Sequence, residues 1–274
     1  DQFNTGDIQW VRGAIDLATT RYQDTIVVNP LFATTYYQFN AAQKPFDDWR
    51  VRRALALLVP WSEIRSSDYQ FLPTSNLVPE IPYYPDVEGI AEQDLARARE
   101  LLEATRLQGV PDFSITVPGG EENQRIAEVF RDAWEPALGV DISIEEVLYP
   151  EYFDLIDDEE YAVGTVSWIG DFADPLTFLE MWTSGSNLNN SAYRNEEFDS
   201  LVRRAMEENG SGRYDTLAEA EELLLWDAIV LPISHSPAIN LVDLTRVDGW
   251  YPNPLDIHPF KFISFAEGGS MRGI

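Results

Sequence analysis

The feature that most constrains the fold is the alternation of helix and strand patterns along the middle of the chain. Five segments follow one another in this order: a helix over 92–105, a strand over 113–119, a helix over 121–137, a strand over 140–148 and a helix near Tyr152. Units of this size are typical of βαβ crossovers, which place successive strands in parallel. The pattern therefore predicts an α/β fold in which helices flank a mixed, mostly parallel sheet.

The next strand in this series lies in the stretch YAVGTVSWIGDFADP, residues 161–175, and it ends in a candidate binding corner. Asp174 and the proline after it form a helix start signal, so Trp168 and Asp171 lie between the strand and the helix. Ligands of open α/β sheets bind outside the carboxyl ends of strands, which makes these two residues candidates for ligand contact. The alternative is that Trp168 packs in the core and Asp171 only forms the turn.

The remaining segments give further expectations about secondary structure. The first are an amphipathic helix over 8–15, strands over 25–28 and 32–40 interrupted by Pro30, and a helix capped by Asp47 or Asp48 and ended by Pro60. A proline-rich extended connection over 67–89 follows, held by Phe71, Leu77, Tyr83 and Tyr84. The last are helices over 198–208 and 217–229, separated by Gly210 and Gly212, and strand-like runs over 230–243 and 258–265.

Charge and composition exclude several classes of function. The chain has 47 acidic and 19 basic residues, a formal charge of -28, which repels phosphate backbones and makes nucleic acid an unfavourable partner. Attraction of cationic ligands, adaptation to salt and solvation of helix faces all remain open as reasons for this charge. The absence of cysteine excludes disulfides and thiolate metal sites.

Motifs for enzymatic chemistry are absent from the sequence. It contains no GxSxG, GxxxxGK[ST], GxGxxG or HExxH pattern, and it has only two histidines. We therefore expect neither catalysis nor a cofactor. No apolar run approaches the roughly 18 residues of a membrane span. Because the chain opens with Asp1, we expect it to be processed or cut from something longer.

The segment NAAQKPFDDWRVRRALALLV, residues 40–59, resembles the solute-binding proteins of the oligopeptide and dipeptide ABC importers, family 5. The residues that carry the resemblance are Asn40, Pro45, Phe46, Asp48, Arg50, Val51, Arg52, Ala54 and Leu55. Further matches follow the family order: FNTGDIQW near the start, WIGDFADP, NNSAYRNEEFDSLV from Asn189 and LPISHSPAINLV from Leu231.

The resemblance implies a lobe of the type II periplasmic-binding-protein kind and a non-catalytic role. It implies that 1–258 form the C-terminal ligand-binding lobe and that 259–274 return toward an N-terminal lobe absent from this chain. The implied function is capture of oligopeptides or dipeptides in a cleft between lobes and delivery to a membrane ABC permease. The implied location is extracytoplasmic, either periplasmic or lipid-anchored to the cell surface.

The resemblance also implies a set of ligand-binding residues. Asp171 matches the acid that meets the ammonium group of a bound peptide in peptide-binding members, a role that needs a fixed counter-charge. The other residues implied to line the cleft are Trp168, Phe172, Tyr36, Asn190 and His235. No metal ligand is implied among them.

Three departures from the family pattern leave the ligand open. Thr165 replaces an arginine of some peptide binders, Asn123 replaces a pocket histidine, and Pro60-Trp61 replace the usual Asp-Arg after the first long helix. Alternatives of the same fold are binding of an oligosaccharide, a nickel chelate or haem. The alternative of another class is a hydrolase that uses the carboxylates of Asp171 and Asp174.

Overall fold

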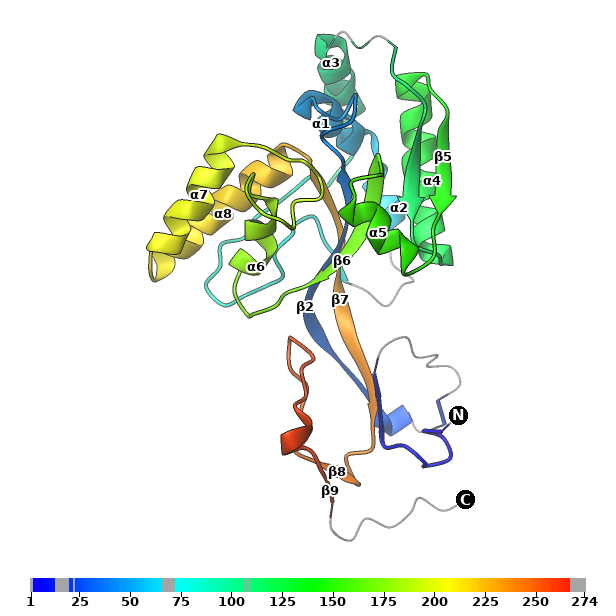
Figure 1. Cartoon of the computed structure of the whole chain (residues 1–274), viewed down its shortest axis with the longest axis vertical. Coiled ribbons are helices and arrows are strands. Elements are labelled where there is room, and N and C mark those ends of the chain that lie inside the picture. The colour runs from blue at the N-terminus through cyan, green and yellow to red at the C-terminus, as the bar shows by residue number, and fades with distance from the viewer. Residues whose placement is uncertain are drawn as a thin grey trace.

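The computed structural model describes residues 2–12, 20–21, 23–65, 72–105, 107 and 109–266. Two long strands, β2 and β7, run from a large body into a smaller base (Figure 1). We call the described residues within 31–236 the body, and those within 2–30 and 237–266 the base. The body holds all the α-helices of the described chain, whereas the base holds short strands and turns.

The elements are as follows. The α-helices are α1 (Trp49–Leu58), α2 (Trp61–Arg65), α3 (Leu95–Thr105), α4 (Glu121–Leu138), α5 (Glu151–Asp157), α6 (Leu176–Leu179), α7 (Glu196–Glu207) and α8 (Ser211–Trp226). The strands are β1 (Trp10–Arg12), β2 (Ile26–Phe39), β3 (Leu72–Pro73), β4 (Phe113–Val117), β5 (Ile142–Glu146), β6 (Val163–Ile169), β7 (Val230–Val242), β8 (Val247–Asp248) and β9 (Ser264–Phe265). The 3-10 turns are η2 (Gln23–Thr25), η3 (Glu180–Trp182) and η4 (Phe260–Phe262).

The main sheet has the strand order β1-β7-β2-β6-β4-β5, with β3 added on β7. The expected mixed sheet flanked by helices is confirmed, and β6, β4 and β5 are parallel because α4 and α5 cross between them. The other pairings, β1 and β3 with β7, and β2 with β6 and β7, are antiparallel. In the described chain, β2 and β7 thus add an antiparallel part beside the parallel strands β6, β4 and β5.

Alternate side chains of β2 divide the helices between the two faces of the sheet. Tyr37 contacts Phe130 of α4 with ring centroids 4.8 Å apart, which defines the α4 face. Tyr36 contacts Trp182 of η3, directly after α6, with centroids 5.6 Å apart, which defines the α6 face. Because successive strand residues point to opposite faces, both faces of the body sheet are packed. The base has its own small apolar cluster around Val242, Val247 and Trp250.

Two expectations near the start of the chain are wrong. Residues 10–12 form β1 rather than a helix, because they pair with residues 240–242 of β7; residues 13–19 lie outside the described part. Pro30 does not interrupt β2, which runs through it. Pro30 lies opposite Pro237 of β7, and the register shifts directly after this pair, so the ladder needs no N–H from Pro30.

The expected cap of α1 is confirmed, since the Asp48 side chain accepts the Arg50 N–H at 2.9 Å. Helix α8 begins at Ser211, so Gly212 lies inside it rather than in the connection. The run 258–265 contains η4 and only two strand residues, because β9 pairs briefly with β8.

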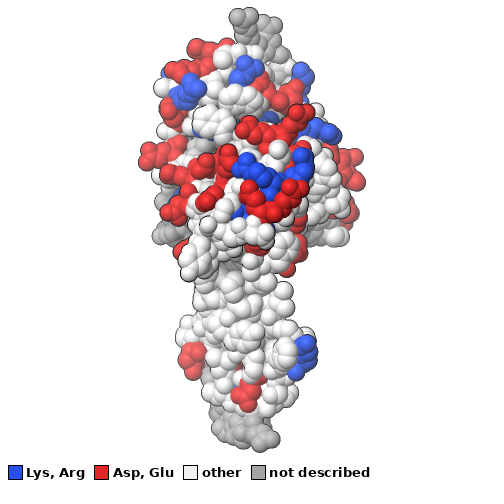
Figure 2. Space-filling view, turned by 90° about the vertical axis from the view of Figure 1, so that its left-hand side faces the viewer, with Lys and Arg blue, Asp and Glu red and all other residues white. Residues whose placement is uncertain are grey.

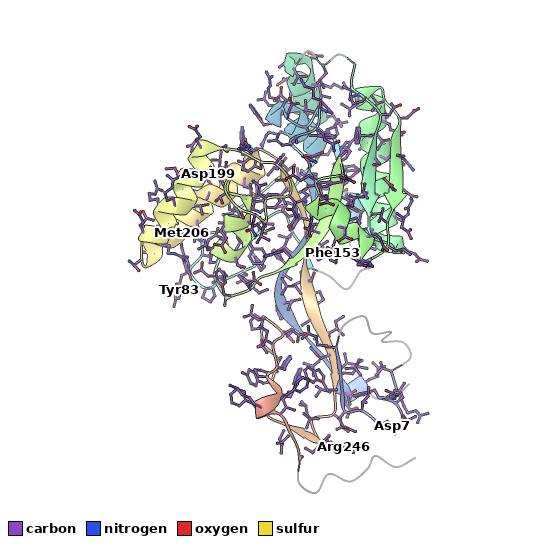
Figure 3. All side chains as sticks on the ribbon, viewed as in Figure 1. Asp7, Tyr83, Phe153, Asp199, Met206 and Arg246 are labelled. Atoms are coloured by element: carbon purple, nitrogen blue, oxygen red, sulfur yellow. The ribbon has the colours of Figure 1, made fainter. Side chains whose placement is uncertain are left out.

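The proline-rich connection over 67–89 is held in part as expected. Leu77 is buried and Tyr84 is partly buried against the core, whereas Tyr83 is 93% exposed at the lower edge of the body (Figure 3). Phe71 lies outside the described residues. Glu221 of α8 also holds this connection in place, because its buried carboxylate accepts the N–H groups of Leu77 and Val78. Apolar packing alone did not predict this contact.

Candidate functional site

The corner that follows β6 is fixed by hydrogen bonds on both sides of Gly170. The Gly170 N–H donates to the Phe32 carbonyl oxygen at 2.9 Å, and the Asp171 N–H donates to Thr177 Oγ1 at 3.0 Å. A Cβ at position 170 would lie 2.7 Å from Phe32 Cδ1 and 2.9 Å from Thr177 Cγ2, so glycine is needed for this close approach. The sequence thus places Asp171 on a rigid support at the carboxyl end of β6.

Asp171 and Asp174 differ in what their carboxylates contact. Asp174 accepts the Leu176 N–H at 2.9 Å, as expected for a cap, and it binds Arg213 through two hydrogen bonds of 2.7 Å. The hydrogen bond to Asp174 raises the pKa of Arg213. The exposed side chain of Asp171 makes no hydrogen bond or ion pair with any residue the structure describes. Asp171 is therefore available to a ligand, whereas Asp174 is committed to Arg213.

Negative charge accumulates at this corner. The pKa of Glu180, one turn beyond Thr177, is raised first by burial and then by the charges of Asp171 and Asp174. Figure 2 shows acidic residues crowding the body on one face, while the narrow part below it carries few charges. An anionic ligand would be repelled here, and an ammonium group would be attracted.

A row of three side chains crosses the sheet beside the corner. Thr34 of β2 lies opposite Trp168 of β6 on one side and opposite His235 of β7 on the other. Residues directly opposite each other in neighbouring strands share a face, and Thr34 shares the α6 face with Tyr36. The structure therefore brings Trp168 and His235 onto one face on either side of Thr34.

The predicted aromatic residues at the corner are partly accessible. Trp168 is half-buried, and its Nε1–H donates to the Thr177 carbonyl oxygen at 3.0 Å, which fixes the ring against the start of α6. Phe172 is 40% exposed beside Asp171. Burial raises the pKa of Tyr36, which is fully buried against Trp182 and so has no surface to offer a ligand in this structure.

Asn190 lies away from the corner. Its side-chain N–H donates to Asp157 Oδ1 at 2.8 Å, and its carbonyl oxygen accepts the Tyr161 hydroxyl at 2.8 Å. Both partners precede β6, whereas Asp171 follows it, so the length of the strand separates the two. The structure does not bring Asn190 together with Trp168, Asp171 and His235.

Two of the three departures from the family pattern, Thr165 and Asn123, have different surroundings. Thr165 is buried, and its hydroxyl donates to the Tyr36 carbonyl oxygen at 3.0 Å, so it is part of the sheet interior. Asn123 is partly buried in the first turn of α4, where its side chain donates to the Pro118 carbonyl oxygen and its own carbonyl accepts the Tyr37 hydroxyl.

A second row on the opposite face was missed by sequence reasoning. Thr35 Oγ1 lies 2.7 Å from Ser167 Oγ and 3.4 Å from Ser236 Oγ, which aligns three hydroxyls across β6, β2 and β7. Within its own strand, each of these three residues is an ordinary strand residue that carries a hydroxyl group. The alignment depends on the register between strands that are far apart in sequence, which no local pattern supplies.

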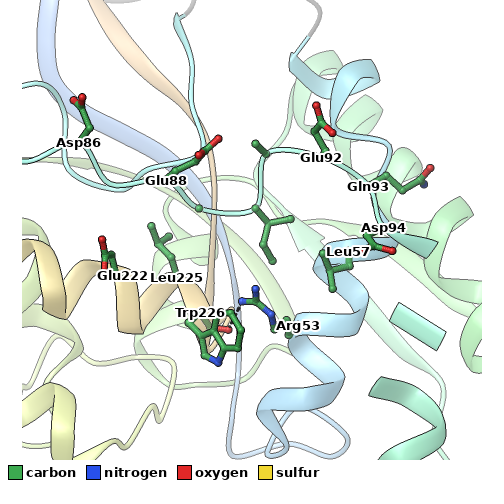
Figure 4. Close-up of a pocket in the computed structure, with 13 residues that line it drawn as sticks. Arg53, Leu57, Asp86, Glu88, Glu92, Gln93, Asp94, Glu222, Leu225 and Trp226 are labelled. Atoms are coloured by element: carbon green, nitrogen blue, oxygen red, sulfur yellow. Dashed lines mark hydrogen bonds between the residues drawn. The ribbon is translucent and has the colours of Figure 1, made fainter. Parts of the chain in front are cut away.

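A separate pocket lies elsewhere in the body, between α1, α8 and the segment 86–94 (Figure 4). It has a volume of about 670 Å³ and is rimmed by the acids Asp86, Glu88, Glu92, Asp94 and Glu222. The Arg53 guanidinium lies 3.5 Å from the centre of the Trp226 ring. None of the predicted ligand-binding residues lines this pocket.

Within the described ranges, no group of three or more His, Asp or Glu side chains is arranged to hold a metal ion. Among the helices that the structure describes, none is long and apolar enough to cross a membrane.

The chain is similar in sequence and in fold to extracellular solute-binding proteins. The family profile described as "Bacterial extracellular solute-binding proteins, family 5 Middle" matches residues 1–190, and the chain belongs to this family. That membership confirms the resemblance carried by residues 40–59.

Individual relatives support the same placement. The oligopeptide-binding protein OppA of Bacillus subtilis is 25% identical over 252 residues, which cover 85% of this chain and 46% of the relative. Heme-binding protein A of Haemophilus influenzae is 30% identical over 242 residues, covering 84% of this chain and 44% of that protein. The crystal structure of Haemophilus influenzae OppA in complex with RPPGFSPFR superposes with a TM-score of 0.79 at 23% identity, covering 96% of this chain and 55% of the other. The chain thus spans about half the length of the relatives it matches.

Proposed function

We propose that this chain contains the C-terminal lobe of the substrate-binding component of an ABC importer. In this proposal, oligopeptides or dipeptides are captured in a cleft between two lobes and delivered to a membrane permease. The complete protein works outside the cytoplasm, in the periplasm or anchored by lipid to the cell surface. No catalytic step takes place on this chain.

The observation that carries the proposal is the carboxylate of Asp171. It is exposed on a rigid corner at the carboxyl end of a central strand, and no described residue neutralises it. A fixed carboxylate is suited to a peptide ammonium group, which needs both a counter-charge and a hydrogen-bond acceptor. Trp168 and Phe172 supply apolar surface beside it. Several relatives are named as peptide-binding proteins, which favours a peptide over other solutes.

The small apolar cluster and the exposed aromatic residues of the base favour contact with a second lobe. Its cluster of Val242, Val247 and Trp250 is small, and Phe260, Phe262 and Phe265 are 78%, 62% and 73% exposed. We propose that the body is the C-terminal lobe and that the base joins the N-terminal lobe, so that β2 and β7 link the two. In this proposal the boundary between the lobes lies at Pro30 and Pro237, rather than at residue 258 as expected from the sequence.

Hydrolysis by a carboxylate pair is disfavoured by the geometry of Asp174. Its two oxygens are occupied by Arg213 and by the Leu176 N–H, so it is not a second free carboxylate beside Asp171. Haem remains the alternative ligand that one observation favours, because a relative 30% identical to this chain is named as a haem-binding protein.

Native mass spectrometry of the complete protein, purified without denaturation, tests the proposal. A ladder of bound masses that matches short peptides would support it. A bound sugar, metal chelate or haem would keep the binding role and overturn the peptide assignment. Loss of the peptide ladder in the D171N variant, with the protein still folded by circular dichroism, would support the role of Asp171.

A further inference from the structure

The hydrogen bonds of Thr34 determine which nitrogen of His235 carries a proton. The Thr34 hydroxyl donates to the Leu77 carbonyl oxygen at 2.7 Å, and Thr34 Oγ1 also lies 3.0 Å from His235 Nδ1. A hydroxyl has one hydrogen to donate, and a carbonyl oxygen only accepts. Since the Thr34 hydrogen goes to Leu77, His235 Nδ1 must be the donor in the second contact.

The other ring nitrogen is then a hydrogen-bond acceptor. A neutral imidazole carries its hydrogen on one nitrogen only, so a hydrogen on Nδ1 leaves a lone pair on Nε2. Burial lowers the pKa of His235 to about 4, which keeps the ring neutral near pH 7. Nε2 has no hydrogen-bond partner among the residues that the structure describes.

The position of His235 relates it to the corner at Asp171. Thr34 lies between His235 and Trp168 in the sheet. Because neighbouring strands are about 4.8 Å apart, the backbones of His235 and Trp168 are separated by roughly 10 Å. An extended peptide covers this span with about three residues. Asp171 follows Trp168 by three residues, so a peptide of about six residues covers both spans, and with its ammonium group on Asp171 it can pass Trp168 and reach His235 with a backbone N–H.

We infer that His235 is held by Thr34 as a fixed acceptor that selects ligands presenting an N–H group to Nε2. The inference rests on the proposed function, because it assumes a peptide bound at Asp171. With Asp171 it gives the site two acceptors, while Arg213 is occupied by Asp174. The site thereby favours an amine and an amide N–H over a carboxylate.

The tautomer is tested without any ligand. Long-range ¹H–¹⁵N correlation spectra of the protein at pH 7 distinguish a protonated from an unprotonated ring nitrogen, and the His235 signals are assigned by their loss in H235Q. His258, whose Nε2 contacts Asp256 at 2.9 Å, is an internal reference in the same spectra. We expect an unprotonated Nε2 on His235. A protonated Nε2 would overturn the inference and leave the proposed function untouched.

The ligand contact is tested by calorimetry on the complete protein with hexaalanine and with analogues N-methylated at each amide. Gln carries its amide near the position of Nε2 and can offer an acceptor there, whereas Asn is shorter and reaches only the position of Nδ1. We expect H235N to weaken hexaalanine binding about tenfold and H235Q to stay within about twofold of the wild type.

One N-methylated analogue should bind the wild type about tenfold more weakly, with no further loss in H235N, because both changes remove the same hydrogen bond. Additive losses in that cycle, or equal affinities of H235N and wild type, would overturn the inference. If the wild type binds no peptide at all, the proposed function fails, and the role of His235 fails with it even when the tautomer is as expected.

Discussion

The Tyr152 hydroxyl contacts both the N–H and the carbonyl oxygen of Thr165, the backbone groups that a neighbouring strand would otherwise bind. It accepts the Thr165 N–H at 2.8 Å and lies 2.8 Å from the Thr165 carbonyl oxygen. β4 and β6 pair only at two positions, the last of which joins Thr116 to Gly164, and then separate. Beyond that point the Tyr152 hydroxyl of α5 supplies the hydrogen bonds on this edge of β6, while β2 pairs with the other edge along the whole strand.

Removal of this hydroxyl should destabilise the body. Tyr152→Phe keeps the ring but leaves the buried N–H of Thr165 unpaired, and we expect the free energy of unfolding to fall by about 1–3 kcal/mol. Urea denaturation followed by circular dichroism measures this change. Tyr149→Phe is the matched control, since Tyr149 is 56% exposed, and its loss should stay within about 0.5 kcal/mol. Equal losses in both variants would contradict the role given to Tyr152.

Local sequence signals predicted the elements around β6 well. The alternation of patterns gave α3, β4, α4, β5, α5 and β6 in the correct order, because helix and strand periods are properties of short segments. Asp48 and Asp174 were correctly expected to cap, since a cap involves only residues two or three positions apart.

Contacts between distant segments could not be predicted in the same way. Residues 10–12 have apolar spacing suited to a helix, yet they form a strand because β7 offers them a partner 230 residues away. The site shows the same limit: the corner at Asp171 was found from a local pattern, whereas the row through Thr34 depends on two strand registers. Tyr36 was expected at the cleft, and only tertiary packing places it beneath Trp182.

Glu221 should make stability depend on pH. Its Oε1 accepts the N–H groups of Leu77 and Val78 at 2.7 and 2.9 Å, and Oε2 lies 2.8 Å from the Tyr84 hydroxyl. Burial raises its pKa from 4.5 to about 7 despite these hydrogen bonds. Between pH 4.5 and 7 the folded state therefore holds more protons at this site than the unfolded state. The contribution of Glu221 to stability is full below about pH 4.5 and falls as the pH rises to 7.

The measurement is the free energy of unfolding in urea at pH 5, 6, 7 and 8. Relative to Glu221→Gln, which does not titrate, the wild type should lose at most about 3 kcal/mol between pH 5 and 8, with little change above 7. Glu207→Gln is the control because Glu207 is an exposed acid on α7 whose charge does not act on Glu221, and it should follow the wild-type profile. Parallel profiles for the wild type and Glu221→Gln would contradict the raised pKa.

Asp171 should contribute binding energy rather than stability. In the complete protein, Asp171→Ala is expected to weaken peptide binding by about 1.5–3 kcal/mol, the usual range for a hydrogen bond to a charged group. Its unfolding midpoint should remain near the wild-type value, because the side chain has no partner among the described residues. Titration calorimetry measures the change in affinity, and thermal unfolding measures the midpoint. Glu103→Gln, an exposed acid on α3, controls for the loss of one negative charge, and unchanged affinity in Asp171→Ala would remove this residue from the site.

Gly170 should be required for the geometry of the corner. In Gly170→Ala the new methyl group would meet Phe32 Cδ1 at 2.7 Å and Thr177 Cγ2 at 2.9 Å, so the corner must move. We expect a loss of stability of about 1–3 kcal/mol, as for overpacking, together with weaker peptide binding, because the hydrogen bond from Asp171 to Thr177 moves with it.

A second change separates crowding from other effects of the alanine. Thr177→Ser removes Cγ2 but keeps the hydroxyl that accepts the Asp171 N–H, so the double variant Gly170→Ala/Thr177→Ser should regain part of the lost stability and affinity. Gly185→Ala is the matched control, since a Cβ there meets nothing within 4 Å, and it should behave like the wild type. If the double variant binds no better than Gly170→Ala, contact with Thr177 is not what holds Asp171 in place. Phe32, which accepts the Gly170 N–H and would meet the same methyl group, then becomes the residue that determines the corner.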